Sequence, residues 1–246
     1  MIAILSPAKN MRQADCPAGV TVTAPQFLEE TQYLWETLRE LAPWELESWF
    51  HVNPQLAMKA AVAFQDFATA REGTPAVFAY NGLAYTNLGA SDFTAEDAAF
   101  CNDHLRILSA FYGLLRPCDA IQSYRLEMGC KLRFDGKTLY QFWGDKLYQA
   151  LFAAGRPVIN LASKEYSKAV TPYLTSADRM ITCDFVTYYK GKLKTLAAPA
   201  KMARGRMVRY MVQNRLTRPE QLQSFDWDGY EFDPELSDEN RYVFRK

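Results

Sequence analysis

Short apolar runs recur along the chain. Several are bounded by proline or glycine, which is typical of strands buried on both faces of a sheet. The first run ends at Pro7, and the second is followed by Asn81-Gly82, a pair that favours a turn. Lys190-Gly191 separates the last two runs and predicts a hairpin between them. The predicted strands cover residues 2–6, 75–80, 105–110, 157–162, 179–187 and 192–197.

Between these runs, apolar residues recur three and four positions apart, which predicts amphipathic helices. Asn53 is a good N-cap because Pro54 follows it at the first helical position. Thr94 and Asp97 have the spacing of a capping box, and Gly155 is a favourable helix end. The predicted helices cover residues 25–38, a short segment after Pro43, 54–70, 94–104, 138–154, 163–170, 199–215 and a short segment from Pro219.

Three segments allow more than one interpretation or form minor elements. Residues 11–24 read as a loop that includes an edge strand around Val20 and Val22. A helical hairpin is an alternative to the strand at 105–110. Residues 230–232 and 242–244 are expected to form a small hairpin near the end of the chain.

The alternation of strands and helices predicts an α/β fold of the mixed α+β kind, with a central mixed sheet surrounded by helices. The chain has 246 residues, and roughly 200–250 residues can still form one α/β unit. Because it contains no internal repeat and no low-complexity linker, we expect a single domain over residues 1–246.

Charge is balanced over the whole chain but segregated near its end. The 28 basic and 28 acidic residues give a formal net charge of zero, so no global field attracts nucleic acid or membrane. Basic residues at 201, 204, 206, 209, 215 and 218 have no acidic residue among them, whereas residues 220–239 hold eight acidic residues and no basic one. The basic helix either offers two basic edges to a phosphate chain or pairs with the acidic tail.

Several functional classes are disfavoured by composition. The apolar start Met1–Leu5 is too short for a secretory signal, and no run approaches the ~18 apolar residues of a membrane span, so a cytoplasmic protein without membrane contact is expected. The five cysteines include no C-x-x-C pair, and there are only two histidines. We therefore expect neither a disulfide framework nor a metal site, and no cofactor.

Two groups of polar residues are candidates for a binding site. Ser6 and Lys9 follow the first predicted strand, and α/β folds usually bind ligands at the carboxyl ends of strands. Arg125 and Glu127 lie two residues apart, so in an extended segment they share a face. There they either form an ion pair or both meet a ligand.

The chain resembles the YaaA peroxide-stress protein family along nearly its whole length. The resemblance rests on motifs that keep their order and spacing. They are Leu5-Ser6-Pro7-Ala8-Lys9, residues 104–109, Tyr112-Gly113-Leu114-Leu115-Arg116-Pro117, residues 124–129, 139–144 and 160–166, Lys201-Met202-Ala203-Arg204-Gly205, and residues 214–217 and 219–222.

This resemblance implies a cytosolic protein that protects cells from hydroperoxide and limits the DNA damage that iron and peroxide cause together. It also implies a mixed α/β fold with a positively charged cleft, and a helix-hairpin-helix element linked to DNA binding. The matching segment is Leu105 to Ile121. This chain has Ala110 where the family pattern often has Gly, which leaves Gly113 for a close approach to phosphate.

We therefore expect a protein that binds DNA without sequence preference; no protein partner is assigned. Tyr112, Tyr124 or Trp143 can stack on exposed bases or, alternatively, pack in the core. The expected DNA contacts are Lys9, Arg106, Arg116, Arg125, Lys164, Lys168, Lys201, Arg204, Arg206 and Arg209.

Two other functions stay open on the sequence. One is an enzyme acting on a nucleotide or on damaged nucleic acid, with Lys9 and Glu127 as acid–base or nucleophilic groups. The other is a non-enzymatic factor that lowers free iron, for which the carboxylates of residues 226–239 would offer only weak ligands.

Overall fold

The fold is organised around the first strand of the chain. The computed structural model describes residues 1–14, 16–68 and 73–246. Strand β1 (Ile2–Leu5) pairs in parallel with β3 (Leu105–Ser109) on one side and with β6 (Val158–Asn160) on the other. Every residue of β1 is buried, which explains its uniformly apolar sequence.

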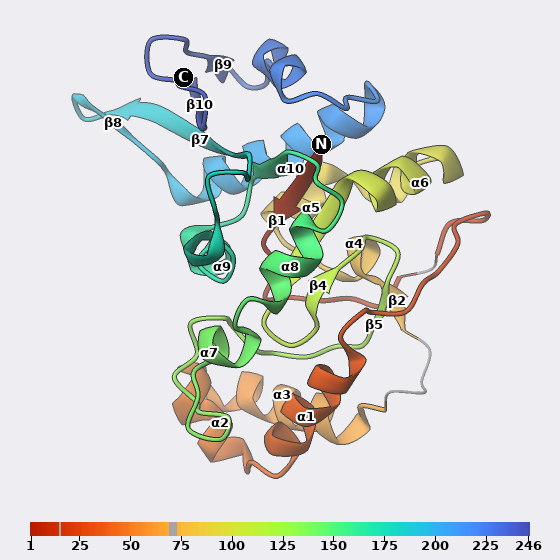
Figure 1. Ribbon diagram of the computed structural model, residues 1–246. Helices are drawn as coiled ribbons and strands as arrows, with labels where there is room; N and C mark the ends of the chain where they lie inside the picture. Colours follow the sequence, from red (N-terminus) through yellow and green to blue (C-terminus); the bar gives the residue numbers. More distant parts are fainter. Residues whose placement is uncertain (15, 69–72) are drawn as a thin grey trace.

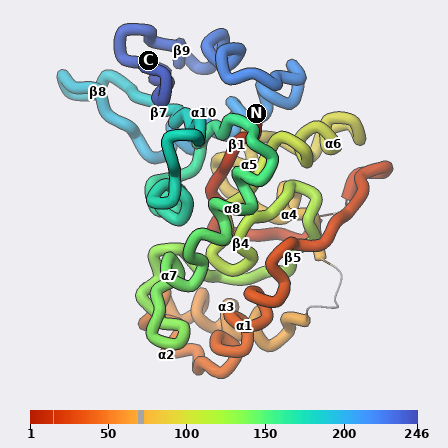
Figure 2. Tube along the Cα trace, in the orientation of Figure 1, coloured from red at the N-terminus to blue at the C-terminus, as the bar shows by residue number. Residues whose placement is uncertain are grey.

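The sheet extends from this centre in both directions. β7 (Met180–Tyr189) lies parallel to β6, and β10 (Arg241–Arg245) lies parallel to β7. The cyan trace of β7 and the dark-blue trace near the C-terminus are neighbours in Figure 2. Antiparallel strands form the edges, which makes the sheet a mixed one. The edge strands are β4 (Gly113–Leu115) beside β3, β9 (Glu231–Phe232) beside β10, and β8 (Lys192–Lys194) beside β7, and a separate ladder joins β2 (Thr74–Pro75) to β5 (Ala120–Ile121).

Helices surround this sheet (Figure 1). Helices α5, α6 and α10 pack together, whereas α1, α2, α3 and α7 gather beyond the β4 edge at the other end of the molecule. The α-helices are α1 (Leu28–Arg39), α2 (Pro43–Phe50), α3 (Pro54–Asp66), α4 (Ala76–Ala79), α5 (Leu83–Leu88), α6 (Ala95–His104), α7 (Leu139–Trp143), α8 (Lys146–Phe152), α9 (Lys164–Ser167) and α10 (Ala197–Gln213). The short 3₁₀ helices of the described residues are η1 (Ala90–Asp92), η2 (Thr171–Tyr173) and η3 (Pro219–Ser224).

The predicted α/β class with a central mixed sheet in one domain is confirmed. The predicted helix N-caps at Asn53 and Thr94 are also confirmed. The Asn53 side chain accepts a hydrogen bond from the Leu56 amide at 2.9 Å. The Thr94 hydroxyl accepts one from the Asp97 amide at 3.1 Å. The small hairpin near the end of the chain forms between β9 and β10.

The strand predicted at 75–80 is wrong beyond its first residue. Ala76–Ala79 is one turn of helix, closed by the Tyr80 amide donating to the Ala76 carbonyl at 3.1 Å. The amides of Ala76 and Val77 are satisfied instead by the carbonyls of Asp119 and Pro117. A short apolar run shows that a segment is buried but does not distinguish a buried strand from a buried helical turn.

Smaller corrections have local causes. The helix predicted at 138–154 is two helices, because Gly144 adopts φ 51 and ends α7 before α8 begins. The edge strand expected within 11–24 is reduced to isolated bridges such as Thr23 with Asp119. The helix predicted to reach residue 70 ends at Asp66, and residues 69–70 lie outside the described ranges.

The helix-hairpin-helix expected at 105–121 does not form there. The segment consists of β3, a turn, β4 and β5, so the strand interpretation of 105–110 holds. Gly113 has φ +74 and is buried; a Cβ atom placed on it would lie 2.7 Å from the Trp143 ring. This glycine therefore makes room for a core tryptophan and cannot reach a phosphate.

Helix α10 packs so closely on α5 that it depends on a glycine. A Cβ atom at Gly205 would lie 1.9 Å from the Ala84 carbonyl oxygen. We expect Gly205→Ala to lower the free energy of unfolding by more than about 3 kcal/mol, because backbone must move to relieve the clash. In Gly191→Ala, at the open turn between β7 and β8 with φ +77, only the strained backbone should cost about 1 kcal/mol. Chemical unfolding of both variants tests this, and equal losses would contradict it.

Candidate functional site

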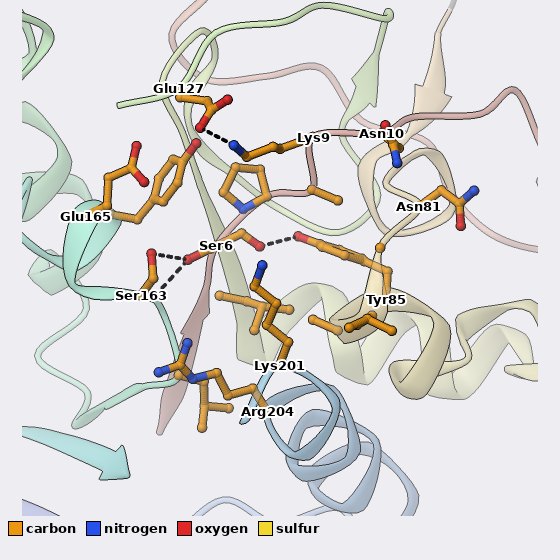
Figure 3. Close-up of a pocket in the computed structure, with 18 of the residues that line it drawn as sticks. Ser6, Lys9, Asn10, Asn81, Tyr85, Glu127, Ser163, Glu165, Lys201 and Arg204 are labelled. Carbon is orange, nitrogen blue, oxygen red and sulfur yellow. Dashed lines mark hydrogen bonds and ion pairs between the residues drawn. The ribbon is translucent and has the colours of Figure 1, made fainter. Parts of the chain in front are cut away.

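A cavity of about 600 Å³ opens where β1 and β6 leave the sheet (Figure 3). The loop after β1, the loop after β6, the turn before α5, the segment at 124–127 and the first turns of α10 all contribute to it. Its polar and charged lining residues are Ser6, Lys9, Asn10, Asn81, Tyr85, Tyr124, Arg125, Glu127, Ser163, Glu165, Tyr166, Lys201 and Arg204.

Two serines connect the loops that follow β1 and β6 by hydrogen bonds. The Ser163 amide donates to the Ser6 hydroxyl oxygen at 2.8 Å, and the Ser6 hydroxyl donates to Ser163 Oγ at 3.2 Å. The Tyr85 hydroxyl holds the Ser6 carbonyl at 2.9 Å. Because parallel strands end at the same edge, residues 157 positions apart become hydrogen-bonded neighbours.

One carboxylate serves two cations at the rim of the cavity. Lys9 Nζ lies 2.7 Å from Glu127 Oε2, and Arg125 Nη2 lies 3.5 Å from Glu127 Oε1. The ion pair between Arg125 and Glu127 that the sequence suggested is therefore formed. Arg125 Nε is buried and has no hydrogen-bond partner within the described residues.

Lys201 and Arg204 enter the cavity from α10 and point toward Ser6 and Ser163 (Figure 3). Neither side chain forms an ion pair or a hydrogen bond with any described residue, and Arg204 Nε is buried. Burial lowers the pKa of the Arg204 guanidinium, an effect opposed by the charge of Asp184. That carboxylate is engaged by Arg241 at 2.8 Å.

The opposite wall holds a carboxylate and a phenol. Glu165 Oε1 accepts a hydrogen bond from the Gly129 amide at 2.9 Å, which fixes the carboxylate near the Arg125 side. Burial raises the pKa of Tyr166 and of Tyr85 well above the usual tyrosine value. Both phenols therefore stay neutral and can donate hydrogen bonds.

Tyr112, Tyr124 and Trp143, for which base stacking and core packing were the two alternatives, are all buried. Tyr112 is 2% exposed and Trp143 is fully buried, so the core-packing alternative holds for both. The Tyr124 hydroxyl lies 2.7 Å from that of Tyr80 and 2.8 Å from Ser109 Oγ. Burial raises the pKa of Tyr124 to about 12.

Four of the predicted contact residues, Lys9, Arg125, Lys201 and Arg204, line the one cavity. Sequence reasoning missed Tyr85, Asn81 and Asn10. Asn81 and Tyr85 follow the segment that was assigned as a strand, so no pattern connected them with the loop after β1. Their hydrogen-bonding side chains at the start of a helix were the available signal.

The other predicted contact residues lie outside this lining. Most of them contact other residues of the fold. Two of them are ion-paired: Arg116 Nε lies 3.2 Å from the buried Asp119, and both outer nitrogens of Arg209 donate to Asp92 at 2.8 and 2.9 Å. Arg206 lies over the Trp227 ring and Lys168 over the Tyr140 ring. Lys164 is exposed at the start of α9.

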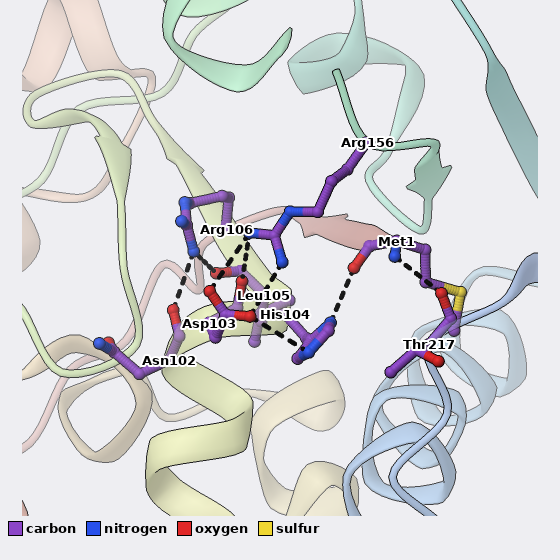
Figure 4. A network of polar contacts seen from close by, with 8 residues as sticks. All are labelled: Met1, Asn102, Asp103, His104, Leu105, Arg106, Arg156 and Thr217. Atoms are coloured by element: carbon purple, nitrogen blue, oxygen red, sulfur yellow. Dashed lines mark hydrogen bonds and ion pairs between the residues drawn. The ribbon is translucent and has the colours of Figure 1, made fainter. Parts of the chain in front are cut away.

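Arg106 belongs to a different network, at the amino end of β3 (Figure 4). Its Nη1 donates to the carbonyls of Leu105 and Asn102 at 2.7 and 2.9 Å. Nearby, Arg156 pairs with Asp103 at 2.9 Å. The cavity lies beyond the carboxyl ends of the parallel strands, so Arg106 and the cavity are at opposite edges of the sheet.

The basic helix and the acidic tail do not neutralise each other. Arg209 and Arg215 of the helix region pair with Asp92 and Asp97, near α6. Carboxylates of the tail pair with other cations, as in Glu220 with Arg179 and Asp233 with Arg245. The pairing that the sequence suggested as an alternative is thus replaced by contacts to other elements.

Two further findings concern metals and membranes. Within residues 1–14, 16–68 and 73–246, no group of three or more His, Cys, Asp or Glu side chains could hold a metal ion. In the same part of the chain, no helix combines the length and apolar character needed to span a bilayer.

Comparison with known proteins gives one consistent result. Residues 1–236 match the family described as "Peroxide stress protein YaaA". The chain is 44% identical over 247 residues to a UPF0246 protein of Limosilactobacillus fermentum, covering 100% of both chains. It is 42% identical over 255 residues to a UPF0246 protein of Saccharophagus degradans, covering 100% of this chain and 99% of that one. A UPF0246 protein of Clostridioides difficile is 36% identical over 247 residues, again with full coverage.

The network around Arg106 predicts a pH dependence of stability. His104 Nδ1 lies 2.8 Å from the Met1 carbonyl, Nε2 lies 3.2 Å from Asp103, and the amino terminus and Arg156 also face the ring. Burial is the largest cause that lowers the pKa of His104 from its ordinary value of 6.5. The unfolded chain then binds a proton at a higher pH than the folded chain, so this group removes stability as the pH falls through 6.5.

We expect His104→Asn, whose amide can replace Nδ1 as a donor to Met1, to lose less stability than the parent protein between about pH 7.5 and about pH 5.5. Urea unfolding at both pH values measures the difference. An identical loss in both proteins would show that His104 does not contribute.

Proposed function

Because the chain belongs to the peroxide stress protein YaaA family, we propose that it acts in the response to peroxide as a DNA-binding protein. In this proposal it holds DNA phosphates at the cavity beyond β1 and β6, and it limits the damage that iron and peroxide cause to the bound strand. The family description supports the role in peroxide stress. The charge of the cavity supports the choice of ligand.

The observation that carries the proposal is the excess of positive charge around one cavity in a chain of zero net charge. Four cations and two carboxylates line it, which leaves two positive charges. Lys9, Arg125, Lys201 and Arg204 come from three separate segments of the chain. Such convergence of donors with positive charge suits phosphate groups, which Arg and Lys contact in most protein–DNA interfaces.

The arrangement favours local contact with a strand over a long duplex interface. The four cations surround a cavity of a size that holds one small ligand, and the remaining predicted contact residues lie outside it. Few phosphates are then neutralised, so a modest salt dependence is expected, with a log–log slope of about −0.7 to −0.9 for each contact.

A second function is favoured by the same cavity. Ser6, Lys9 and Glu127 line it together, and the 2.7 Å contact between Lys9 and Glu127 places an acid–base pair in the same cavity as a serine hydroxyl. This is the arrangement expected of an enzyme acting on a nucleotide or on damaged nucleic acid. Product formation from such substrates, lost in Glu127→Gln, would support catalysis; turnover that persists in this variant would exclude the pair as its catalytic groups.

DNA binding is tested with charge variants of opposite effect. We expect Lys201→Gln with Arg204→Gln to weaken binding at least about tenfold and to make the salt slope shallower. Glu127→Gln should tighten binding, because it releases Lys9 and Arg125 from their shared carboxylate. Fluorescence anisotropy of a labelled oligonucleotide, titrated at several salt concentrations, measures both effects.

Lys192→Gln with Lys194→Gln is the matched control, since it removes two exposed positive charges from β8, which is outside the cavity lining. Its affinity should stay close to that of the parent protein. Equal weakening by the cavity and β8 variants would mean that binding follows net charge alone. Absence of binding at low salt would exclude the proposal.

A further inference from the structure

The cavity has two different charge environments. At the rim, Lys9 and Arg125 share the carboxylate of Glu127. On the α10 side, Lys201 and Arg204 have no ion pair with any described residue and point toward the Ser6 and Ser163 hydroxyls (Figure 3). The excess positive charge of the cavity is therefore concentrated on its α10 side.

The α10 side also leaves a buried hydrogen-bond donor without an acceptor among the described residues. Arg204 Nε is buried and unpartnered within the described residues, although a buried charged donor is normally paired. Ser163 Oγ accepts from Ser6, which leaves the Ser163 hydroxyl hydrogen free to donate outward. A ligand that fills this space must accept several hydrogen bonds and carry negative charge.

We propose that Lys201, Arg204 and Ser163 form a subsite for a phosphomonoester, as found at a phosphorylated strand end or on a free nucleotide. That DNA carries this phosphate rests on the proposed function. The new element is that the group recognised is a terminal phosphate and not one inside a strand.

The charge of the ligand separates a monoester from a diester. A phosphomonoester carries about −1.5 to −2 charges at pH 7 and offers three terminal oxygens. A diester inside a strand carries one charge and offers two such oxygens. The two positive charges left by the lining match the monoester.

The shape of the cavity favours the same choice. Leu5 and Leu161 also line it and are 1% and 0% exposed, so buried apolar side chains close the cavity on one side. A diester needs an exit for the chain on both sides of the phosphate. A terminal phosphate needs only one.

The test compares oligonucleotides of one sequence and length that carry a 5′-phosphate, a 3′-phosphate or only hydroxyl ends, with an internal fluorophore. We expect a phosphorylated end to bind at least about tenfold more tightly than hydroxyl ends, because charge-assisted hydrogen bonds are among the strongest. Arg204→Gln should remove this difference. Arg206→Gln, on the same helix but over Trp227, should keep it.

Competition identifies the source of the phosphate. Displacement by a nucleoside monophosphate but not by the nucleoside would support the phosphomonoester and identify a free nucleotide as an occupant. Displacement only by a phosphorylated strand would support the strand end. Equal affinity for phosphorylated and hydroxyl ends, with no competition by the monophosphate, would overturn the subsite and leave DNA binding intact.

A stability measurement keeps the subsite testable without DNA. Removing an unpaired, half-buried cation should not destabilise the fold, so Arg204→Met should have a Tm at or above that of the parent protein in phosphate-free buffer. Inorganic phosphate should raise the Tm of the parent protein and leave that of Arg204→Met unchanged. If no oligonucleotide binds but this phosphate effect appears, the subsite stands and the proposed function fails. A phosphate effect equal in both proteins would count against the subsite.

Discussion

The burial of β1 at the centre of a parallel sheet is the constraint on which the rest of the structure depends. With β3 on one side and β6 on the other, the backbone of Ile2–Leu5 is paired on both edges and its side chains are covered on both faces. The chain leaves β1 toward β3 on one side and leaves β6 toward β7 on the other, so the loops after these two adjacent strands diverge. Such a switch point is where α/β sheets bind ligands beyond the carboxyl ends of their strands. The hydrogen bonds between Ser6 and Ser163 occupy this point.

The distribution of charge follows from the same frame. Several cations elsewhere in the fold are paired within it, as in Arg116 with Asp119 and Arg209 with Asp92. In the cavity beyond the strand ends, Lys201 and Arg204 have no ion pair with any carboxylate in the described part of the chain. An unpaired and half-buried guanidinium does not favour folding, since its desolvation is not repaid by a partner. Its presence is better explained by a ligand than by stability.

Sequence patterns predicted elements well where one physical signal dominated, and less well where two conformations satisfy the same signal. Caps at Asn53 and Thr94 were correct because they depend on a few adjacent residues. The run at 75–80 was buried as expected, but its amides found partners in the segment at 117–119, which is distant in the sequence, and a helical turn resulted. Gly113 likewise showed where a left-handed conformation is needed, yet its neighbour is Trp143 rather than a phosphate.

By itself, the sequence determined the fold class, most of the strands and helices, the family, and the residue types available for binding an anion. Only the tertiary structure decided which cations act together. Arg106 and Lys9 both lie near parallel strands of one sheet, but Arg106 is at the amino end of β3 and Lys9 follows the carboxyl end of β1. Strand direction and sheet order, which are set by long-range pairing, place them at opposite edges. The same long-range packing brings Lys201 and Arg204 of α10 beside a loop almost 200 residues earlier in the chain.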